Sequence, residues 1–198
     1  MKPEITASWE KFLNPESLKQ QLLVGGIYLA AYEMLKSSLV EQPRDFFCFE
    51  FKNGKRSISA KYRTEVLSLD KHSYRASALW WKKQGVITDA DVTLAGQIRE
   101  HRDEIAHNIP KFLGTADHVI QLDLLESIFE ILGKIDKWWV REVEIPSNPD
   151  FDGREFTDAE LDDVMSGNMA FLSLIIPIAF GDDNRLKALY EHWKTLKH

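Results

Sequence analysis

The sequence has almost no cysteine and no long apolar run. Cys48 is the one cysteine among 198 residues, which excludes an intramolecular disulfide, a CxxC redox pair and a thiolate-rich zinc site. The longest apolar run, residues 169–180, is too short to span a bilayer and contains Pro177. The N-terminal residues carry charges where a signal peptide needs an apolar stretch. These features predict a cytoplasmic protein without membrane contact.

Several motifs of well-known enzyme classes are also missing. The sequence contains no G-x-x-x-x-G-K-[ST], G-x-G-x-x-G or G-x-S-x-G, so nucleotide hydrolases, dinucleotide enzymes and serine hydrolases lack support. His72, His118, His192 and His198 show no ligand spacing such as HExxH. We therefore expect neither a metal nor another cofactor.

The net charge is moderate, but the charged residues are unevenly distributed along the sequence. A formal net charge of −6 argues against a protein that coats nucleic acid nonspecifically. Residues 52–83 hold nine basic and two acidic side chains, whereas residues 141–163 hold two basic and nine acidic ones. This distribution predicts either a local phosphate-facing surface in the basic stretch or two solvated faces.

Apolar residues recur at intervals of three and four through most of the chain, which predicts an all-α fold. The expected helices cover residues 15–41, 72–83, 88–109, 118–143, 157–180 and 184–197. Thr88 with Asp91 three positions later predicts a capping box, and we expect Pro43 and Pro110 to end helices. Gly85 is expected to stop the second helix.

A change of period interrupts the helices. Phe47, Phe49 and Phe51 alternate before Asn53-Gly54, which predicts a two-residue β-hairpin turn with its Phe face packed on the helices. We therefore expect one domain in two parts. Residues 1–145 form a helical bundle with the hairpin inserted at about 46–59, and residues 146–198 form a C-terminal helical extension packed on the same domain.

The stretch with the most chemical information is R-D-E-I-A-H-N, at the end of the predicted helix 88–109. Arg102 offers a rigid fork of donors that suits a phosphate and stabilises charge on phosphoryl oxygens. His107 can take or give a proton near neutral pH. Asp103 precedes His107 by four residues and so lies on the same helix face, where it can orient the imidazole ring.

This arrangement, with its capped helix, R-x-x-x-x-H pattern, proline and following long helix, resembles the HEPN family over about residues 15–143. The resemblance implies an up-down helical bundle that acts as a metal-independent endoribonuclease, as a toxin or antiphage effector. The nucleophile would be the 2′-hydroxyl of the RNA substrate, leaving a 2′,3′-cyclic phosphate. It also implies a homodimer with paired motifs in a shared cleft, and leaves room for an antitoxin or other regulatory partner. Ile109 stands where HEPN toxins paired with a minimal nucleotidyltransferase antitoxin carry a Tyr, so control through that Tyr is not expected.

Helix geometry bears on the assembly independently. Positions 102 and 107 lie about 140° apart on a straight helix, so one chain cannot easily aim both side chains at one atom. Either the last turn unwinds ahead of Pro110 and swings His107 round, or two copies meet about a twofold axis and each supplies half of the site.

Other residues have weaker support, and simpler roles remain open for the main ones. Further RNA contacts are expected from Arg99, Arg75, Lys82, Lys83 and Asn108. The pairs Trp80-Trp81 and Trp138-Trp139 are expected in the core rather than as base-stacking platforms, and Arg99 and His101 are expected at the surface. Arg102 could instead pair with an acid, and His107 could cap the helix end. The alternative function is a noncatalytic HEPN-fold interaction module that binds a partner protein or nucleotide. The net acidity favours this module, or else a narrow substrate such as one structured RNA.

Overall fold

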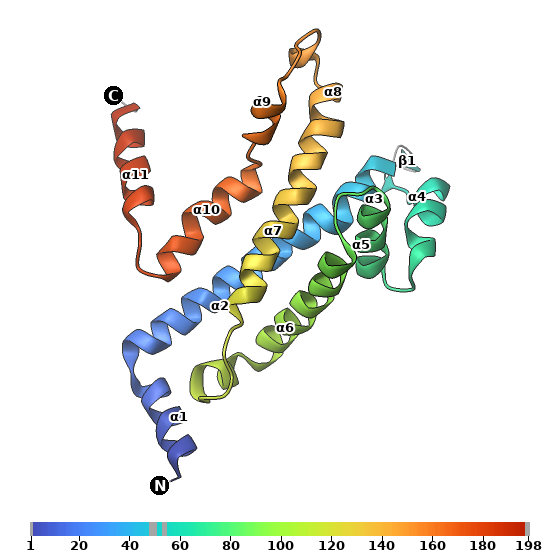
Figure 1. The fold of residues 1–198 in the computed structure, drawn as a ribbon. Helices are drawn as coiled ribbons and strands as arrows, with labels where there is room; N and C mark the ends of the chain where they lie inside the picture. The colour runs from blue at the N-terminus through green and yellow to red at the C-terminus, as the bar shows by residue number, and fades with distance from the viewer. Residues whose placement is uncertain (1, 48–50, 53–54, 197–198) are drawn as a thin grey trace.

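The structure, a computed structural model, describes residues 2–47, 51–52 and 55–196, and this part of the chain is almost entirely helical (Figure 1). The all-α prediction is therefore confirmed. The helices are α1 (Pro3–Leu13), α2 (Pro15–Lys36), α3 (Gln42–Phe47), α4 (Ala60–Glu65), α5 (Ser73–Lys83), α6 (Asp89–Gly114), α7 (Leu122–Trp139), α8 (Ile145–Ser147), α9 (Asp158–Asp162), α10 (Gly167–Ala179) and α11 (Asn184–Leu196). Turns of 3-10 helix lie at Leu67–Leu69 and Pro149–Phe151, and π-helical turns at Ser37–Glu41 and Val140–Glu144.

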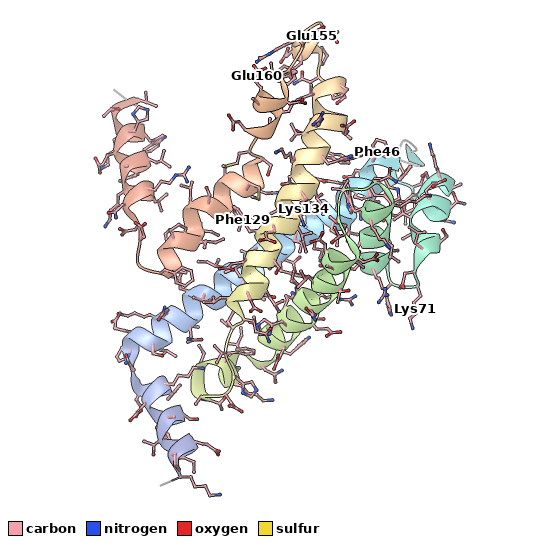
Figure 2. All side chains as sticks on the ribbon, viewed as in Figure 1. Phe46, Lys71, Phe129, Lys134, Glu155 and Glu160 are labelled. Carbon is pink, nitrogen blue, oxygen red and sulfur yellow. The ribbon has the colours of Figure 1, made fainter. Side chains whose placement is uncertain are left out.

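The core is built around α2, which packs against α6, α7 and α10 (Figures 1 and 2). Tyr28 and Leu35 of α2 are fully buried, as are Ile98 of α6 and Ile128 of α7. The Tyr28 hydroxyl donates to the Ile98 carbonyl at 3.3 Å, so the one polar atom of this side chain is satisfied inside the apolar core. This central packing brings the middle of α6 against the second half of α2.

Aromatic side chains fill the end of the bundle where α3, α5 and α7 meet. Trp80 and Trp81 are buried, as the sequence predicted, and their rings pack edge to face at 4.8 Å between centroids. Trp138 is partly buried and packs against both of them. Phe46, labelled in Figure 2, and buried Phe47 close the cluster from α3.

Pro43 does not end the first long helix, contrary to our expectation. The chain continues from α2 through the π-helical turn Ser37–Glu41 into α3, with Pro43 inside it. A proline has no N–H, so the carbonyl of Leu39, four residues earlier, lacks its usual helical donor. The buried indole of Trp81 supplies one instead, because its Nε1 donates to the Leu39 carbonyl at 2.9 Å.

Helix α6 begins as predicted and extends further than predicted. The Thr88 hydroxyl accepts from the Asp91 amide while the Asp91 carboxylate accepts from the Thr88 amide, which completes the capping box. Beyond it the helix passes Pro110 and ends at Gly114. The one non-helical residue inside it is Asn108, at φ −128° and ψ 25°, so a bend two residues before Pro110 takes the place of the expected end.

The predicted helix 157–180 is two helices. Thr157 caps α9 through a capping box with Glu160, but α9 is only five residues long, and α10 begins afresh at Gly167. Ser166 causes the second start, because its hydroxyl accepts from the Met169 amide as an N-cap. The same hydroxyl donates to the buried Asp136 carboxylate of α7 at 2.5 Å, which fixes the beginning of α10 on the bundle.

The two end helices are attached differently. The sequence reading did not anticipate α1, which buries none of its residues. Lys11 anchors it by donating to the carbonyls of Thr115 at 2.9 Å and His118 at 2.6 Å. Helix α11 was anticipated, and it also has no buried residue.

The predicted hairpin falls partly outside the described residues, which omit Phe49, Asn53 and Gly54. Strands β1 (Phe51–Lys52) and β2 (Lys55–Arg56), which are described, pair antiparallel. Phe47, which we expected in a strand, is the last residue of α3. Residues 57–59 are not a strand either, because the Ser59 hydroxyl accepts from the Tyr62 amide and caps α4.

Candidate functional site

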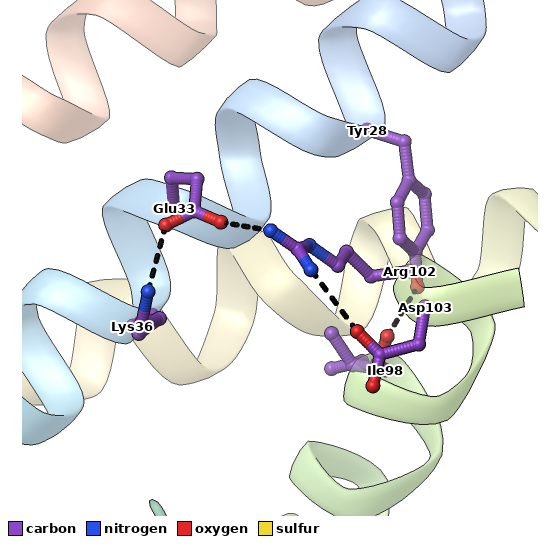
Figure 3. A network of polar contacts seen from close by, with 6 residues as sticks. All are labelled: Tyr28, Glu33, Lys36, Ile98, Arg102 and Asp103. Atoms are coloured by element: carbon purple, nitrogen blue, oxygen red, sulfur yellow. Dashed lines mark hydrogen bonds and ion pairs between the residues drawn. The ribbon is translucent and has the colours of Figure 1, made fainter. Parts of the chain in front are cut away.

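Arg102 lies near the middle of α6, between the two carboxylates shown in Figure 3 and beside the ring of Tyr32. Its Nη2 donates to Glu33 of α2 at 2.6 Å, and its Nη1 donates to the neighbouring Asp103 at 3.0 Å. The guanidinium carbon lies 5.0 Å from the ring centroid of Tyr32. Lys36 also donates to Glu33, at 3.1 Å. With the side chain 30% exposed, these contacts fix the fork while leaving it open to solvent.

These contacts shift the pKa values of Arg102 and Glu33. Burial acts to lower the pKa of Arg102, but hydrogen bonds to Asp103 and Glu33 outweigh it, so the pKa is raised above its usual value. Burial acts to raise the pKa of Glu33, and hydrogen bonds from Lys36 and Arg102 outweigh it, so that pKa is lowered. Arg102 therefore stays cationic and Glu33 anionic at neutral pH.

Arg102 lines a groove of about 440 Å³ between α2, the start of α5 and α6, which we call the basic groove. Its lining residues are Tyr32, Lys36, Val40, Lys71, His72, Ser73, Tyr74, Arg99, Arg102 and Asp103. Four of them are cationic and one is acidic, so the groove carries net positive charge in an acidic protein. The N-terminus of α5 adds to this, because its partial positive charge and free amides lie at Ser73.

A second groove, of about 540 Å³, adjoins the basic groove and shares His72, Tyr74, Arg99 and Asp103 with it. It runs between α5 and α6 and also includes Arg75. Arg99, whose guanidinium carbon lies 5.8 Å from the Tyr74 ring centroid, stands where the two grooves meet. The two grooves are therefore continuous with one another, and Arg99 lies where they join.

His107 does not line either groove. It is exposed on α6, one turn beyond Asp103 and immediately before the bend at Asn108. The hydrogen bond found for the Asp103 carboxylate comes from Arg102. The structure therefore lines the basic groove with Arg99, Arg102 and Asp103, and His107 is not part of that lining.

The remaining predicted RNA contacts are scattered. Lys82 and Lys83 lie at the opposite end of α5 from the basic groove, where Lys82 pairs with Asp89 at 2.5 Å and Lys83 pairs with Glu65 at 3.1 Å. Asn108 forms the bend of α6.

Sequence reasoning missed Lys36, Tyr32 and Tyr74 as groove residues, and it misplaced His101. Tyr74 is buried, and its hydroxyl has no hydrogen-bond partner among the described residues. The excess of positive charge over residues 52–83 was a usable signal for Lys71, which lies in the groove. No comparable signal marked Lys36 or the tyrosines, since their places depend on how α2 packs.

His101 was expected at the surface but is only 5% exposed. Its Nε2 accepts from the Gln121 amide at 3.0 Å, and its ring meets Tyr28 and Phe112 edge to face. Burial lowers the pKa of His101, with Glu104 opposing the shift. His101 is thus a neutral core histidine that anchors the start of α7.

Comparisons with known proteins add no assignment: no protein-family profile, curated protein or solved structure matches this chain. Within the described ranges, no three His, Cys, Asp or Glu side chains are grouped so as to hold a metal ion. None of the helices described is both long and apolar enough to cross a membrane.

Proposed function

We propose that this chain is a metal-independent endoribonuclease of the HEPN type, with a HEPN-like bundle, acting as a toxin or antiphage effector. The observation that carries the proposal is Arg102, held by Glu33 and Asp103 in the basic groove beside two lysines and a second arginine. A guanidinium fixed in this way meets a phosphate without first losing side-chain freedom. RNA is the substrate, because the chemistry needs a 2′-hydroxyl that DNA lacks.

The reaction assigned to the site is a transfer within the RNA. The 2′-oxygen attacks the adjacent phosphorus, the bond from phosphorus to the 5′-oxygen breaks, and a 2′,3′-cyclic phosphate forms. The 2′-hydroxyl loses its proton and the departing 5′-oxygen gains one, for which His107 is the proposed proton-transfer group. Arg102 stabilises the charge on the phosphoryl oxygens.

The proposed reaction uses two copies of the chain. Arg102 lines the basic groove and His107 does not, which favours a site shared between copies. A twofold axis near the α6 bend would set His107 of one copy beside the groove of the other. The dimer with a shared cleft therefore remains part of the proposal.

The test is cleavage of total RNA by the purified protein in excess chelator. Arg102→Ala and His107→Ala should each lower the rate by about a hundredfold or more. Lys19→Ala, which removes an exposed cation of α2 outside the basic groove, is the matched control and should cleave normally. Because Arg102 also joins α2 to α6, Arg102→Lys and a melting curve for each variant separate lost chemistry from lost folding.

The products decide the mechanism. Cyclic-phosphate ends and intact DNA are expected. Activity that disappears in chelator and returns with Mg²⁺ or Mn²⁺ contradicts the mechanism, since a metal nuclease depends on its ion.

A second candidate is the noncatalytic interaction module. The observation in its favour is that both hydrogen-bonded partners of Arg102 are carboxylates of its own chain, an arrangement that also suits a structural ion pair. Expression separates the two candidates. An active toxin arrests growth, and Arg102→Ala and His107→Ala relieve the arrest. A wild-type chain that is harmless and leaves RNA intact supports the module.

A further inference from the structure

Helix α11 has an apolar face that its own chain leaves exposed. Leu186, Leu189, Tyr190 and Leu196 follow one side of the helix and are between 41% and 71% exposed. None of the 13 residues of α11 is buried. Isolated helices of this length are marginal in water, because helices in proteins gain most of their stability from packing. The apolar face of α11 therefore needs cover from outside its own bundle.

A complementary apolar groove lies between α7 and α10, which we call the α7/α10 groove. It has a volume of about 550 Å³, and its apolar lining includes Leu125, Phe129, Ile176 and Phe180. Phe129 is labelled on α7 in Figure 2. The charged lining residues are Glu126 and Glu130, one turn apart on α7 and both exposed. The groove is thus apolar inside and acidic along one rim.

The charges of α11 are opposite to those of the groove. The helix carries three basic residues, Arg185, Lys187 and Lys194, against one acidic residue, Glu191. At 100° per residue, Arg185 flanks one edge of the apolar face and both lysines flank the other. When the apolar face enters the groove, one basic edge of the helix meets the acidic rim.

The joint between α10 and α11 directs α11 away from the groove of its own chain. Gly181 takes a φ of +83°, its amide donates to the Ile178 carbonyl at 3.0 Å, and the Asp182 amide donates to the Pro177 carbonyl at 3.0 Å. These two bonds form a Schellman motif, which fixes the direction in which the chain leaves α10. Helix α11 then runs away from α7 and contributes no lining residue (Figure 1).

We propose that two copies of the chain exchange α11, each placing the apolar face of this helix in the α7/α10 groove of the other. The exchange is reciprocal, as a twofold dimer requires, so each contact forms twice. It is independent of the ribonuclease proposal, because it uses no residue of the basic groove or of the R-x-x-x-x-H motif.

The experiment measures mass in solution by light scattering during size exclusion, using the full chain at micromolar concentration. The wild type should be a dimer. An arm variant, Leu189→Asp with Leu186→Asp, and a groove variant, Glu126→Lys with Glu130→Lys, should each weaken dimerisation about tenfold or more. All four positions are exposed, so the substitutions should leave the fold intact, which circular dichroism checks.

Mixing the two variants gives the decisive result. The arm variant keeps an unaltered groove, and the groove variant keeps an unaltered α11. A heterodimer of the two therefore has one native contact, so the mixture should contain dimers at concentrations where each variant alone is monomeric. Thr195→Asp on the polar face of α11 and Glu155→Lys far from the groove are the matched controls and should remain dimeric. A monomeric wild type overturns the proposal, and so does a dimer that both variants leave unchanged.

Discussion

Replacing Trp81 with Phe should lower the free energy of unfolding by about 2–4 kcal/mol. The indole donates to the Leu39 carbonyl, whose usual helical partner is missing at Pro43. Phe cannot donate, and a buried carbonyl left without a partner costs about 1–3 kcal/mol. Trp81 is completely buried, so the smaller ring also leaves a cavity that costs about 1 kcal/mol or more.

A second substitution separates these two contributions. Pro43→Ala restores an N–H four residues after Leu39, so the carbonyl regains a backbone donor. In that background Trp81→Phe should cost only the cavity, about 1 kcal/mol. The double-mutant cycle should therefore give a coupling of about 1–3 kcal/mol between positions 43 and 81.

Urea unfolding followed by far-UV circular dichroism measures all four proteins without relying on tryptophan fluorescence, which the substitution changes. Equal costs of Trp81→Phe in both backgrounds would refute the reasoning. In that case the indole stabilises the bundle by packing alone, and its hydrogen bond does not compensate for the proline.

Three further predictions concern stability. Burial holds the pKa of His101 below its unfolded value of about 6.5, so neutral His101 contributes its full stabilisation above that pH. As pH falls below about 6.5, the free energy of unfolding should drop by up to about 1.4 kcal/mol per pH unit. His101→Gln should flatten this part of the stability curve, measured by urea unfolding between pH 5 and 8. Asp91→Ala should lower unfolding free energy by about 2–3 kcal/mol, because it removes both the bond to Thr88 and the pairing with Lys134 at 2.9 Å; a drop no larger than that of an exposed aspartate would show that the cap is dispensable. Gly85→Ala should cost about 1 kcal/mol through backbone strain alone, since φ is +75° and nothing lies within 4 Å of the new methyl, and an unchanged melting temperature would contradict it.

Local signals in the sequence correctly predicted two helix starts and one helix stop. The capping box at Thr88, the stop at Gly85 and the cap at Thr157 are each set by hydrogen bonds within a few residues, so they can be read from the sequence itself. The proline rules failed for a reason that lies elsewhere in the chain. At Pro43 the missing donor is replaced by Trp81, which lies 38 positions later.

The candidate site shows the same contrast between local signals and contacts between distant parts of the chain. Arg102, Asp103 and Arg99 could be named because they stand together on one helix. Glu33, which holds Arg102, is 69 positions away on α2, and periodicity identifies the buried side of α2 but not which of its turns meets which turn of α6. The same limit hid the burial of His101, since an apolar environment made by Tyr28 and Phe112 exists only after the helices pack.

The position of α2 at the centre of the bundle has a consequence for synthesis. This helix leaves the ribosome before α10, against which it packs, and 130 residues lie between Lys36 and Gly167. At about 5–20 residues per second, roughly 6–26 s pass before α10 follows. During that interval the part of α2 that α10 contacts in the folded protein remains uncovered. Chaperone dependence should therefore be greatest for chains paused before α10 is made.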